Sequence, residues 1–142
     1  MTDMNDLNRQ VITEFRANEG KVGGGFAGAP MVLVHHRGRK SGTEYVSPVV
    51  YLAKEGDDGS IYIFASKGGA PENPEWYENL VAAGDTTIEL GAGSYPVTIR
   101  ELHGEERDRV YAEQVSRMPG FGDYERKAAG IRTIPVLELR RR

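Results

Sequence analysis

Hydrophobic residues near the start of the chain recur every three or four positions, whereas later segments carry continuous or alternating apolar runs. The first spacing predicts a helix over residues 3–18 with one apolar stripe. The members of the stripe are Met4, Leu7, Val11, Ile12 and Phe15. Such a helix either docks on the protein core or rests on a membrane surface. We predict docking, because the segment lacks the lysines and the large aromatic content of membrane-surface helices.

A glycine-rich segment separates the N-terminal helical region, residues 1–19, from the rest of the chain. Residues 20–30 contain five glycines and one proline, a composition that interrupts both helices and strands. We interpret this segment as a flexible linker or as a lid that closes over a ligand.

Short apolar runs bounded by turn residues predict strands over the remainder of the chain. The predicted strands are residues 31–36, 44–52, 61–65, 86–90, 95–102 and 133–139. Helical spacing predicts helices over residues 73–83 and 105–117 and a short helical piece over residues 122–129. Asn73 is predicted to cap the first of these helices.

The order of these elements indicates the fold class. No G-x-G-x-x-G turn joins a strand to a helix, and strands do not alternate regularly with helices, which argues against a Rossmann sheet. Most strands are joined by short turns. We therefore predict one α+β domain over residues 1–142, mainly β, built on an antiparallel barrel with appended helices.

The composition excludes several classes of function. The 142 residues carry a formal charge of −3, whereas wholesale binding to nucleic acid needs a basic face. The chain has no cysteine, so thiolate metal sites and disulfides are excluded. Its three histidines are too scattered to predict a metal site. Because neither a signal peptide nor a run of roughly 18 apolar residues is present, we expect a cytoplasmic protein.

Two polar loops carry the most informative chemistry. Residues 38–42 read Gly-Arg-Lys-Ser-Gly and residues 65–69 read Ala-Ser-Lys-Gly-Gly, each beside a predicted strand. A single basic turn is often only solvated, but two loops at strand ends can meet at one rim of a barrel. Arg39, Lys40 and Lys67, together with accessible backbone N–H groups, would then suit a phosphate.

Aromatic residues follow the second loop. Trp76 and Tyr77 begin the helix predicted there, and Trp76 either anchors the core or walls a flat ligand. Asn79 shares the helix face of Trp76. Met118, Phe121 and Tyr124 recur every three residues and form either core packing or an apolar roof over a substrate.

The sequence shows no motif of hydrolytic chemistry. It has neither G-x-S-x-G nor H-E-x-x-H, and no evident pair of catalytic acids. A chain that can hold a phosphorylated ring, but lacks a nucleophile and a metal site, suits redox chemistry carried by a cofactor.

Taken together, these motifs resemble the deazaflavin-dependent nitroreductase family. The resemblance covers about residues 30–139, in order and at the family's spacing. It is carried by residues 38–42, 48–52, 65–69, 73–80, 119–124 and 134–136. The resemblance implies an antiparallel split β-barrel of the FMN-binding split-barrel type. It also implies coenzyme F420, a deazaflavin that bears a phosphate and a polyglutamate tail.

The resemblance assigns site residues as well. It implies that Arg39, Lys40 and Ser41 hold the phosphate and the tail. The residues implied to line the deazaflavin are Tyr45, Val46, Ser47, Pro48, Val49, Val50, Phe64, Ala65, Ser66 and Lys67. The helix start that completes the pocket is implied to comprise Glu75, Trp76, Tyr77, Glu78 and Asn79.

The substrate side departs from that of the family's nitroimidazole-activating member. Tyrosines line the substrate side of that member at the positions of Val50, Met118, Phe121 and Tyr124, and only Tyr124 is a tyrosine here. Because Val, Met and Phe offer no O–H donor, we expect reduction of quinones or of electron-poor C=C bonds in enones and unsaturated lactones such as coumarins. Tyr124 or water would deliver the proton, and Ser66 or its backbone N–H would polarise the acceptor or orient the ring.

Two other functions stay open on the sequence alone. One is an FMN-dependent oxidoreductase, since flavin proteins share the barrel, and the other is a non-catalytic barrel that binds a deazaflavin or an apolar metabolite. The expected partner is a small planar apolar substrate. We expect a monomer or homodimer with at most peripheral association with the inner face of a membrane.

Overall fold

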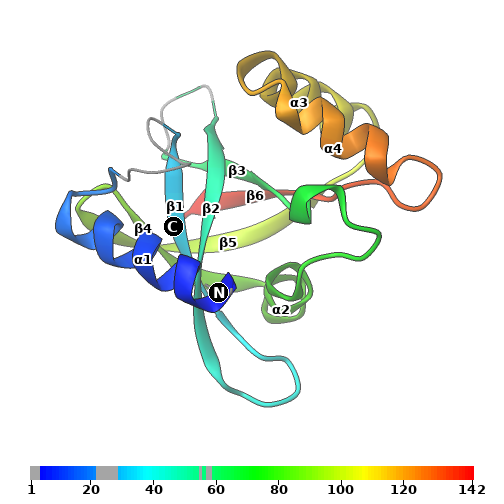
Figure 1. Cartoon of the computed structure of the whole chain (residues 1–142). Coiled ribbons are helices and arrows are strands. Elements are labelled where there is room, and N and C mark those ends of the chain that lie inside the picture. Colours follow the sequence, from blue (N-terminus) through cyan, green and yellow to red (C-terminus); the bar gives the residue numbers. More distant parts are fainter. Residues whose placement is uncertain (1–3, 22–28, 55, 57–58) are drawn as a thin grey trace.

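The structure, a computed structural model, describes residues 4–21, 29–54, 56 and 59–142. Its helices are α1 (Met4–Ala17), the 3-10 turn η2 (Lys67–Gly69), α2 (Glu75–Ala83), α3 (Gly104–Arg117) and α4 (Gly120–Ala128). Its strands are β1 (Met31–Arg37), β2 (Glu44–Ala53), β3 (Ile61–Phe64), β4 (Asp85–Leu90), β5 (Gly93–Leu102) and β6 (Val136–Arg141). Figure 1 shows α3 and α4 together on one side of the strands, with α1 and α2 elsewhere around them.

The strands form a closed barrel in the order β1-β2-β3-β6-β5-β4, and every neighbouring pair is antiparallel. The predicted antiparallel barrel is therefore confirmed. The long strand β2 pairs with β1 from Glu44 to Val50 and with β3 from Tyr51 to Ala53. Because one strand serves two partners in succession, the sheet can bend and close without a free edge.

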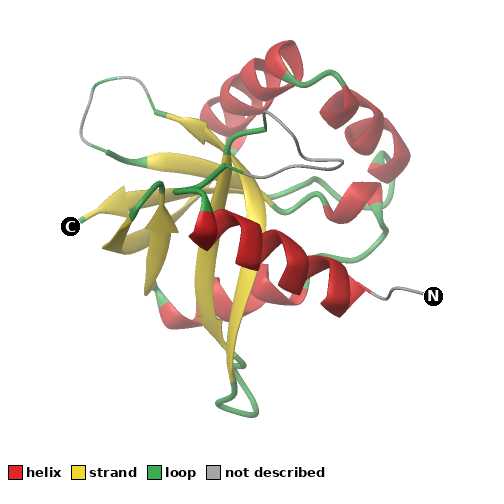
Figure 2. Cartoon of the chain, turned by 60° about the vertical axis from the view of Figure 1, so that its left-hand side comes forward, coloured by secondary structure: helices red, strands yellow, loops and turns green. Residues whose placement is uncertain are grey.

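Alternating side chains explain how the barrel and the helices share one core. On β3, Ile61 and Ile63 belong to the cluster inside the barrel, whereas Tyr62 and Phe64 belong to the cluster under α3 and α4. Leu80 of α2 is fully buried and joins the interior cluster. Figure 2 shows the strands enclosed by helices on several sides.

Helix α1 docks on the outside of the barrel, as predicted. Phe15 is 1% exposed and packs in a cluster with Met31 and Leu33 of β1. At the end of the helix, Arg16 makes two bonds to Glu89 of β4, at 3.0 and 2.7 Å. Residues 22–28 of the segment interpreted as a linker or lid lie outside the described residues.

Two local predictions were wrong. The last strand spans Val136–Arg141 rather than residues 133–139, because β5 continues to offer ladder partners to Arg140 and Arg141 after the apolar run has ended. Asn73 does not cap α2, whose N-cap is Pro74, because the Oδ1 of Asn73 instead accepts a hydrogen bond from Arg132 at 2.8 Å.

Candidate cofactor-binding site

A cavity of about 490 Å³ opens at one rim of the barrel. The turn between β1 and β2 forms one wall, and the start of α2 forms the other. Its lining residues are His36, Gly38, Arg39, Lys40, Ser41, Tyr45, Glu75 and Asn79. The structure thus brings together the first predicted polar loop and the predicted helix start. We refer to this space as the rim cavity.

Local hydrogen bonds fix the shape of the first loop. The N–H of Gly38 donates to the carbonyl of Thr43 at 2.8 Å, and the N–H of Gly42 donates to the carbonyl of Gly38 at 2.8 Å. The Oγ of Ser41 accepts the N–H of Thr43 at 3.2 Å. Gly42 has φ +74°, a left-handed conformation that favours glycine. The loop is thereby held in a form that exposes Lys40 and Ser41.

Arg39 is the best-anchored cation of the rim cavity. Its backbone N–H and Nη1 both donate to the Oδ1 of Asn79, at 3.1 and 3.0 Å. Its guanidinium also pairs with Glu75 at 2.9 Å and with Glu78 at 2.6 Å. Asn79 is 4% exposed, whereas the two carboxylates are exposed on the surface of α2. The buried amide therefore holds Arg39 in place, and the carboxylates form exposed, exchangeable ion pairs.

The other two predicted cations, Lys67 and Lys40, both act on Glu75 through their charges. Hydrogen bonding and charge from Arg39, followed by the charges of Lys67 and Lys40, hold the pKa of Glu75 below its ordinary value. Lys67 pairs with Glu72 at 2.8 Å. Lys40 makes no hydrogen bond or ion pair with the part of the chain that the structure describes. Arg39 and Lys40 thus line the rim cavity, where the exposed Lys40 can meet an anion, whereas Lys67 is not among the lining residues.

Arg132 shapes the second loop, and the sequence analysis missed it. Its guanidinium donates to the carbonyls of Ala65, Ser66 and Ala70 at 3.0, 2.9 and 2.9 Å, in addition to its bond to Asn73. Burial lowers the pKa of Arg132 below its ordinary value. No spacing signal marks this arginine in the sequence, because its partners are backbone carbonyls from about 60 positions earlier.

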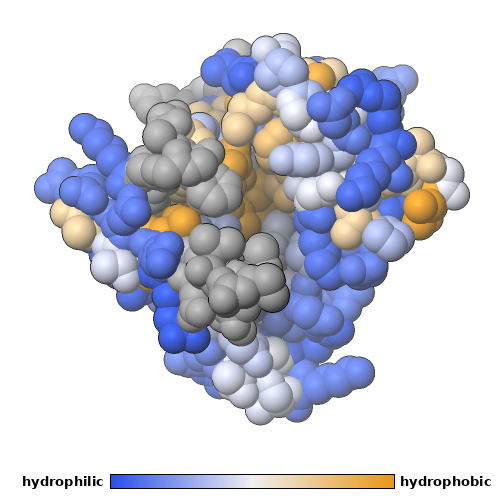
Figure 3. Space-filling view, viewed as in Figure 1, coloured by the Kyte–Doolittle hydropathy of each residue, from blue (hydrophilic) through white to orange (hydrophobic). Residues whose placement is uncertain are grey.

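An apolar cluster adjoins the second loop. The ring of Phe64, just before this loop, meets Phe121 edge-on at 5.7 Å between centroids, and Phe121 meets Tyr124 at 5.2 Å. The partly buried Val50 and Met118 pack against the same cluster. Figure 3 shows a hollow with an apolar floor between α4 and the strands β2 and β3. The predicted substrate-lining residues are therefore in one cluster.

The packing of η2 on α4 links Ser66 to Tyr124. A Cβ atom at Gly69 would lie 3.0 Å from both the carbonyl oxygen of Tyr124 and the Cβ of Lys127. Ser66 immediately precedes η2 as its N-cap. The two predicted catalytic residues consequently lie on elements in direct contact.

Other predicted site residues are distributed over both faces of the barrel wall. Along β2, Val46 and Val50 pack toward α1, and Val49 packs against the interior cluster. Ser47 lies within hydrogen-bonding distance of His36, whereas Pro48 pairs with Leu33 of β1. Of the residues from 45 to 50, only Tyr45 lines the rim cavity. Successive side chains of a strand point to opposite faces, so a continuous run of residues on β2 cannot all line one cavity.

Trp76 and Tyr77 also contact the core. Both are partly buried and pack against the interior cluster of the barrel. The hydroxyl of Tyr77 donates to the carboxylate of Glu101 at 2.9 Å, and burial together with this bond raises the pKa of Tyr77 to about 12. Their packing supports the core-anchor alternative for these positions and leaves their predicted contact with the cofactor as a prediction.

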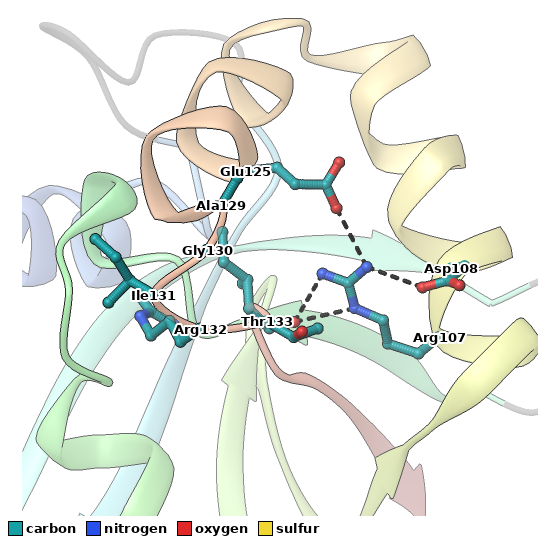
Figure 4. A pocket seen from close by; sticks show the side chains of 9 residues that line it. Arg107, Asp108, Glu125, Ala129, Gly130, Ile131, Arg132 and Thr133 are labelled. Atoms are coloured by element: carbon teal, nitrogen blue, oxygen red, sulfur yellow. Dashed lines mark hydrogen bonds and ion pairs between the residues drawn. The ribbon is translucent and has the colours of Figure 1, made fainter.

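A second cavity, of about 450 Å³, lies between α3 and the segment after α4 (Figure 4). The side chain of Arg107, 8% exposed, donates to the carbonyl of Ile134 at 3.1 and 2.9 Å. It also pairs with Asp108 at 3.1 Å and Glu125 at 3.2 Å. The guanidinium groups of Arg107 and Arg132 already donate hydrogen bonds to backbone carbonyls of the protein. We therefore do not assign the cofactor to this cavity.

The described residues offer neither a metal site nor a membrane-spanning helix. They contain no group of three or more His, Asp or Glu side chains arranged to hold a metal ion. Within the same residues, no helix has the length and hydrophobicity needed to cross a membrane.

Comparison with known proteins decides the family. The sequence profile of the F420H(2)-dependent quinone reductases matches residues 7–140. The chain belongs to this family. Rv3178 of Mycobacterium tuberculosis, for which this activity has been proposed, is 35% identical over 123 residues, covering 86% of this chain and 99% of Rv3178.

Solved structures agree with this assignment. The F420-H2 dependent reductase FDR-A is 34% identical, with a TM-score of 0.67 over 78% of this chain and 93% of that chain. Another structure, a domain-swapped dimer, is also 34% identical, with a TM-score of 0.67 over 78% of this chain and 79% of that chain. The protein is thus an F420H2-dependent oxidoreductase with a split β-barrel, and its cofactor is coenzyme F420. The expected family, fold and cofactor are confirmed, in preference to the FMN-dependent and non-catalytic alternatives.

Proposed function

We propose that this F420H2-dependent oxidoreductase reduces small, planar, apolar acceptors. Quinones are the first class, and compounds with an electron-poor C=C bond, such as enones and coumarins, are the second. Two features of one barrel carry the proposal. The first polar loop, with Arg39 and Lys40, lines the rim cavity. An apolar aromatic cluster that includes Phe64, the residue just before the second polar loop, offers a surface for a flat acceptor.

The rim cavity suits the acidic part of the cofactor. Arg39, Lys40 and Ser41 would hold the phosphate and the tail, since they offer two cations and a hydroxyl at one wall of the cavity. Glu75 and Glu78 would release the guanidinium as the anion binds, because exposed ion pairs are worth only about 0–1 kcal/mol. Asn79 would keep Arg39 in position during this exchange.

The apolar cluster suits a flat acceptor without hydrogen-bonding groups on its faces. Met118 and Phe121 offer no O–H donor, so this wall selects by shape and apolar contact. Tyr124 contributes the one phenol among the predicted substrate-lining residues. We infer that this surface prefers quinones and coumarins to nitroimidazoles.

When bound, the reduced cofactor supplies a hydride to the electrophilic carbon of the acceptor. By holding the acceptor beside the bound cofactor, the protein would lower the entropic cost of the reaction. The hydroxyl of Tyr124, or water, delivers a proton to the reduced acceptor. Ser66, through its hydroxyl or backbone N–H, polarises the acceptor carbonyl or orients the ring.

The test is a panel of acceptors offered to the purified protein with F420H2 and, separately, with reduced FMN. The panel contains a naphthoquinone, a cyclic enone, a coumarin and a nitroimidazole, and loss of the reduced cofactor is followed by absorbance. We expect the naphthoquinone to give the highest kcat/KM, the enone or coumarin a lower one, and the nitroimidazole the lowest. Preferred turnover of the nitroimidazole, or turnover only with reduced FMN, would contradict the proposal.

A further inference from the structure

His36 lies in the wall of the rim cavity, and both nitrogens of its ring are engaged. Nε2 is 2.9 Å from the Oγ of Ser47, and Nδ1 is 3.0 Å from the Nδ2 of Asn79. The ring stacks on Tyr45, with the centroids 5.4 Å apart and the planes inclined by 24°. This histidine sits in the apolar strand that precedes the first polar loop, and nothing in that pattern suggests a role in binding.

The bonds of Asn79 determine the hydrogen-bonding state of His36. The Oδ1 of Asn79 accepts both the backbone N–H and the Nη1 of Arg39. Since these two donors fix the oxygen side of the amide, its NH2 group faces His36 and donates to Nδ1. Nδ1 is then the acceptor, and Nε2 carries the hydrogen and donates it to Ser47. This assignment requires a neutral imidazole.

The surroundings of the ring favour the same neutral state. Burial, followed by the charge of the adjacent His35, lowers the pKa of His36 to about 4. His36 also borders another cavity, on the side of β4. Besides the two histidines, the titratable or charged groups that line the rim cavity are Arg39, Lys40, Tyr45 and Glu75. Those that line the cavity beside β4 are Arg37, Glu44, Tyr45 and Asp85. At neutral pH the ring therefore remains an acceptor at Nδ1.

We propose that His36 is a positioning residue for the cofactor: it orients the amide of Asn79, which in turn holds Arg39 where its guanidinium meets the phosphate and acidic tail. This inference rests on the proposed function, which assigns that anion to Arg39. A half-turn of the amide would set its NH2 group against the N–H donors of Arg39 and its Oδ1 against the acceptor Nδ1 of His36, so that these part-buried groups would lose their partners. The acceptor on His36 opposes that half-turn.

Two substitutions of His36 that differ in one acceptor test the proposal. The leucine of His36→Leu fills much of the volume of the imidazole but cannot accept a hydrogen bond from Asn79. The asparagine of His36→Asn keeps an oxygen near the position of Nδ1, which can accept that bond. Affinity is measured by fluorescence titration with coenzyme F420, and kinetics with F420H2 and a naphthoquinone. We expect His36→Leu to weaken F420 binding about tenfold, with the loss in KM for F420H2 rather than in kcat, and His36→Asn to restore binding to within about threefold. His103→Leu, at the exposed N-cap of α3, is the control and should bind F420 as the unsubstituted protein does.

A measurement on the unsubstituted protein covers the case in which His36→Leu fails to fold. The ¹⁵N shifts of the histidine rings identify the tautomer, and we expect His36 to be neutral with the hydrogen on Nε2 at pH 7 and to stay neutral down to about pH 5. A hydrogen on Nδ1, or protonation near the ordinary pKa of about 6.5, would overturn the proposal. Equal F420 affinity in His36→Leu would overturn it as well.

Arg39→Ala distinguishes binding of the anion by Arg39 from the positioning role of His36. If Arg39→Ala binds F420 as tightly as the unsubstituted protein, the assignment of the anion to Arg39 fails, and the role of His36 fails with it. If Arg39→Ala binds weakly and His36→Leu binds normally, only the role of His36 fails. Weak binding by both, with rescue by His36→Asn, supports both.

Discussion

Arg132 shows at the scale of one residue how a side chain outside the cofactor cavity can control a loop beside it. Four hydrogen bonds from its guanidinium join the loop of Ser66 to the segment that precedes β6. Removing the side chain leaves several part-buried carbonyls without a donor, each at a cost of about 1 kcal/mol or more.

We therefore expect Arg132→Ala to lower the free energy of unfolding by about 2 kcal/mol, measured by urea denaturation. Arg126→Ala is the matched control, because Arg126 is exposed and, among the described residues, its side chain pairs with the exposed Asp123 alone. The control should change stability by less than about 0.5 kcal/mol. Equal losses in the two variants would show that Arg132 does not organise the loop.

Tyr124 carries the phenol of the proposed proton transfer. Tyr124→Phe keeps the ring that meets Phe121 and removes only the hydroxyl. We expect kcat for naphthoquinone reduction to fall about 10- to 100-fold with little change in F420 affinity, since water replaces the phenol only in part. Tyr95→Phe, on β5, serves as the control. Full activity of Tyr124→Phe would remove this residue as the proton donor.

Two adjacent glycines test the contact between η2 and α4. Gly68 and Gly69 both have positive φ, +64° and +85°, so alanine strains the backbone at either position. Only at Gly69 would the added Cβ meet α4, whereas nothing lies within 4 Å of it at Gly68. Gly69→Ala should therefore be about 1–2 kcal/mol more destabilising than Gly68→Ala, and it should lower turnover more. Thermal unfolding of the pair measures the difference, and equal effects would mean that backbone strain alone matters.

At the level of elements, the sequence predicts what depends on local pattern. Each predicted helix and strand is present, because the short apolar run of β3 and the helical stripe of α1 are local signals. The end of β6 was missed, since pairing with β5 rather than hydropathy sets it. The cationic loops were found from their composition. His36 and Arg132 were not, because their partners are distant in the chain and leave no spacing.

At the scale of the whole molecule, Glu138 is the one carboxylate buried among the residues that the structure describes, and it pairs with cations of two neighbouring segments. The side chain of Glu138 is fully buried and pairs with Lys54 at 2.5 Å and Arg100 at 2.7 Å. Burial by itself raises the pKa of Glu138, but hydrogen bonds from Lys54 and Arg100 outweigh it and hold the pKa below the ordinary value. Its contribution to stability is therefore present above pH 4.5 and is lost as the pH falls through the folded-state pKa.

Glu138→Gln tests this dependence on pH. We expect the variant to be about 2 kcal/mol less stable at pH 7, and the difference from the unsubstituted protein to shrink below pH 4.5. Urea denaturation between pH 3 and 7 measures both, with Glu44→Gln as an exposed control. A difference that is constant over this range would indicate that ionisation of Glu138 plays no part.

The central claim is that cations of the rim cavity bind the acidic end of coenzyme F420. The most direct measurement is fluorescence titration of the protein with F420 and with a deazaflavin that lacks the phosphate and the tail, at low and high salt. We predict about tenfold tighter binding of F420 at low salt, a smaller difference at high salt, and no difference in the Arg39→Ala/Lys40→Ala double variant. Equal affinity for the two compounds in the unsubstituted protein would contradict the account.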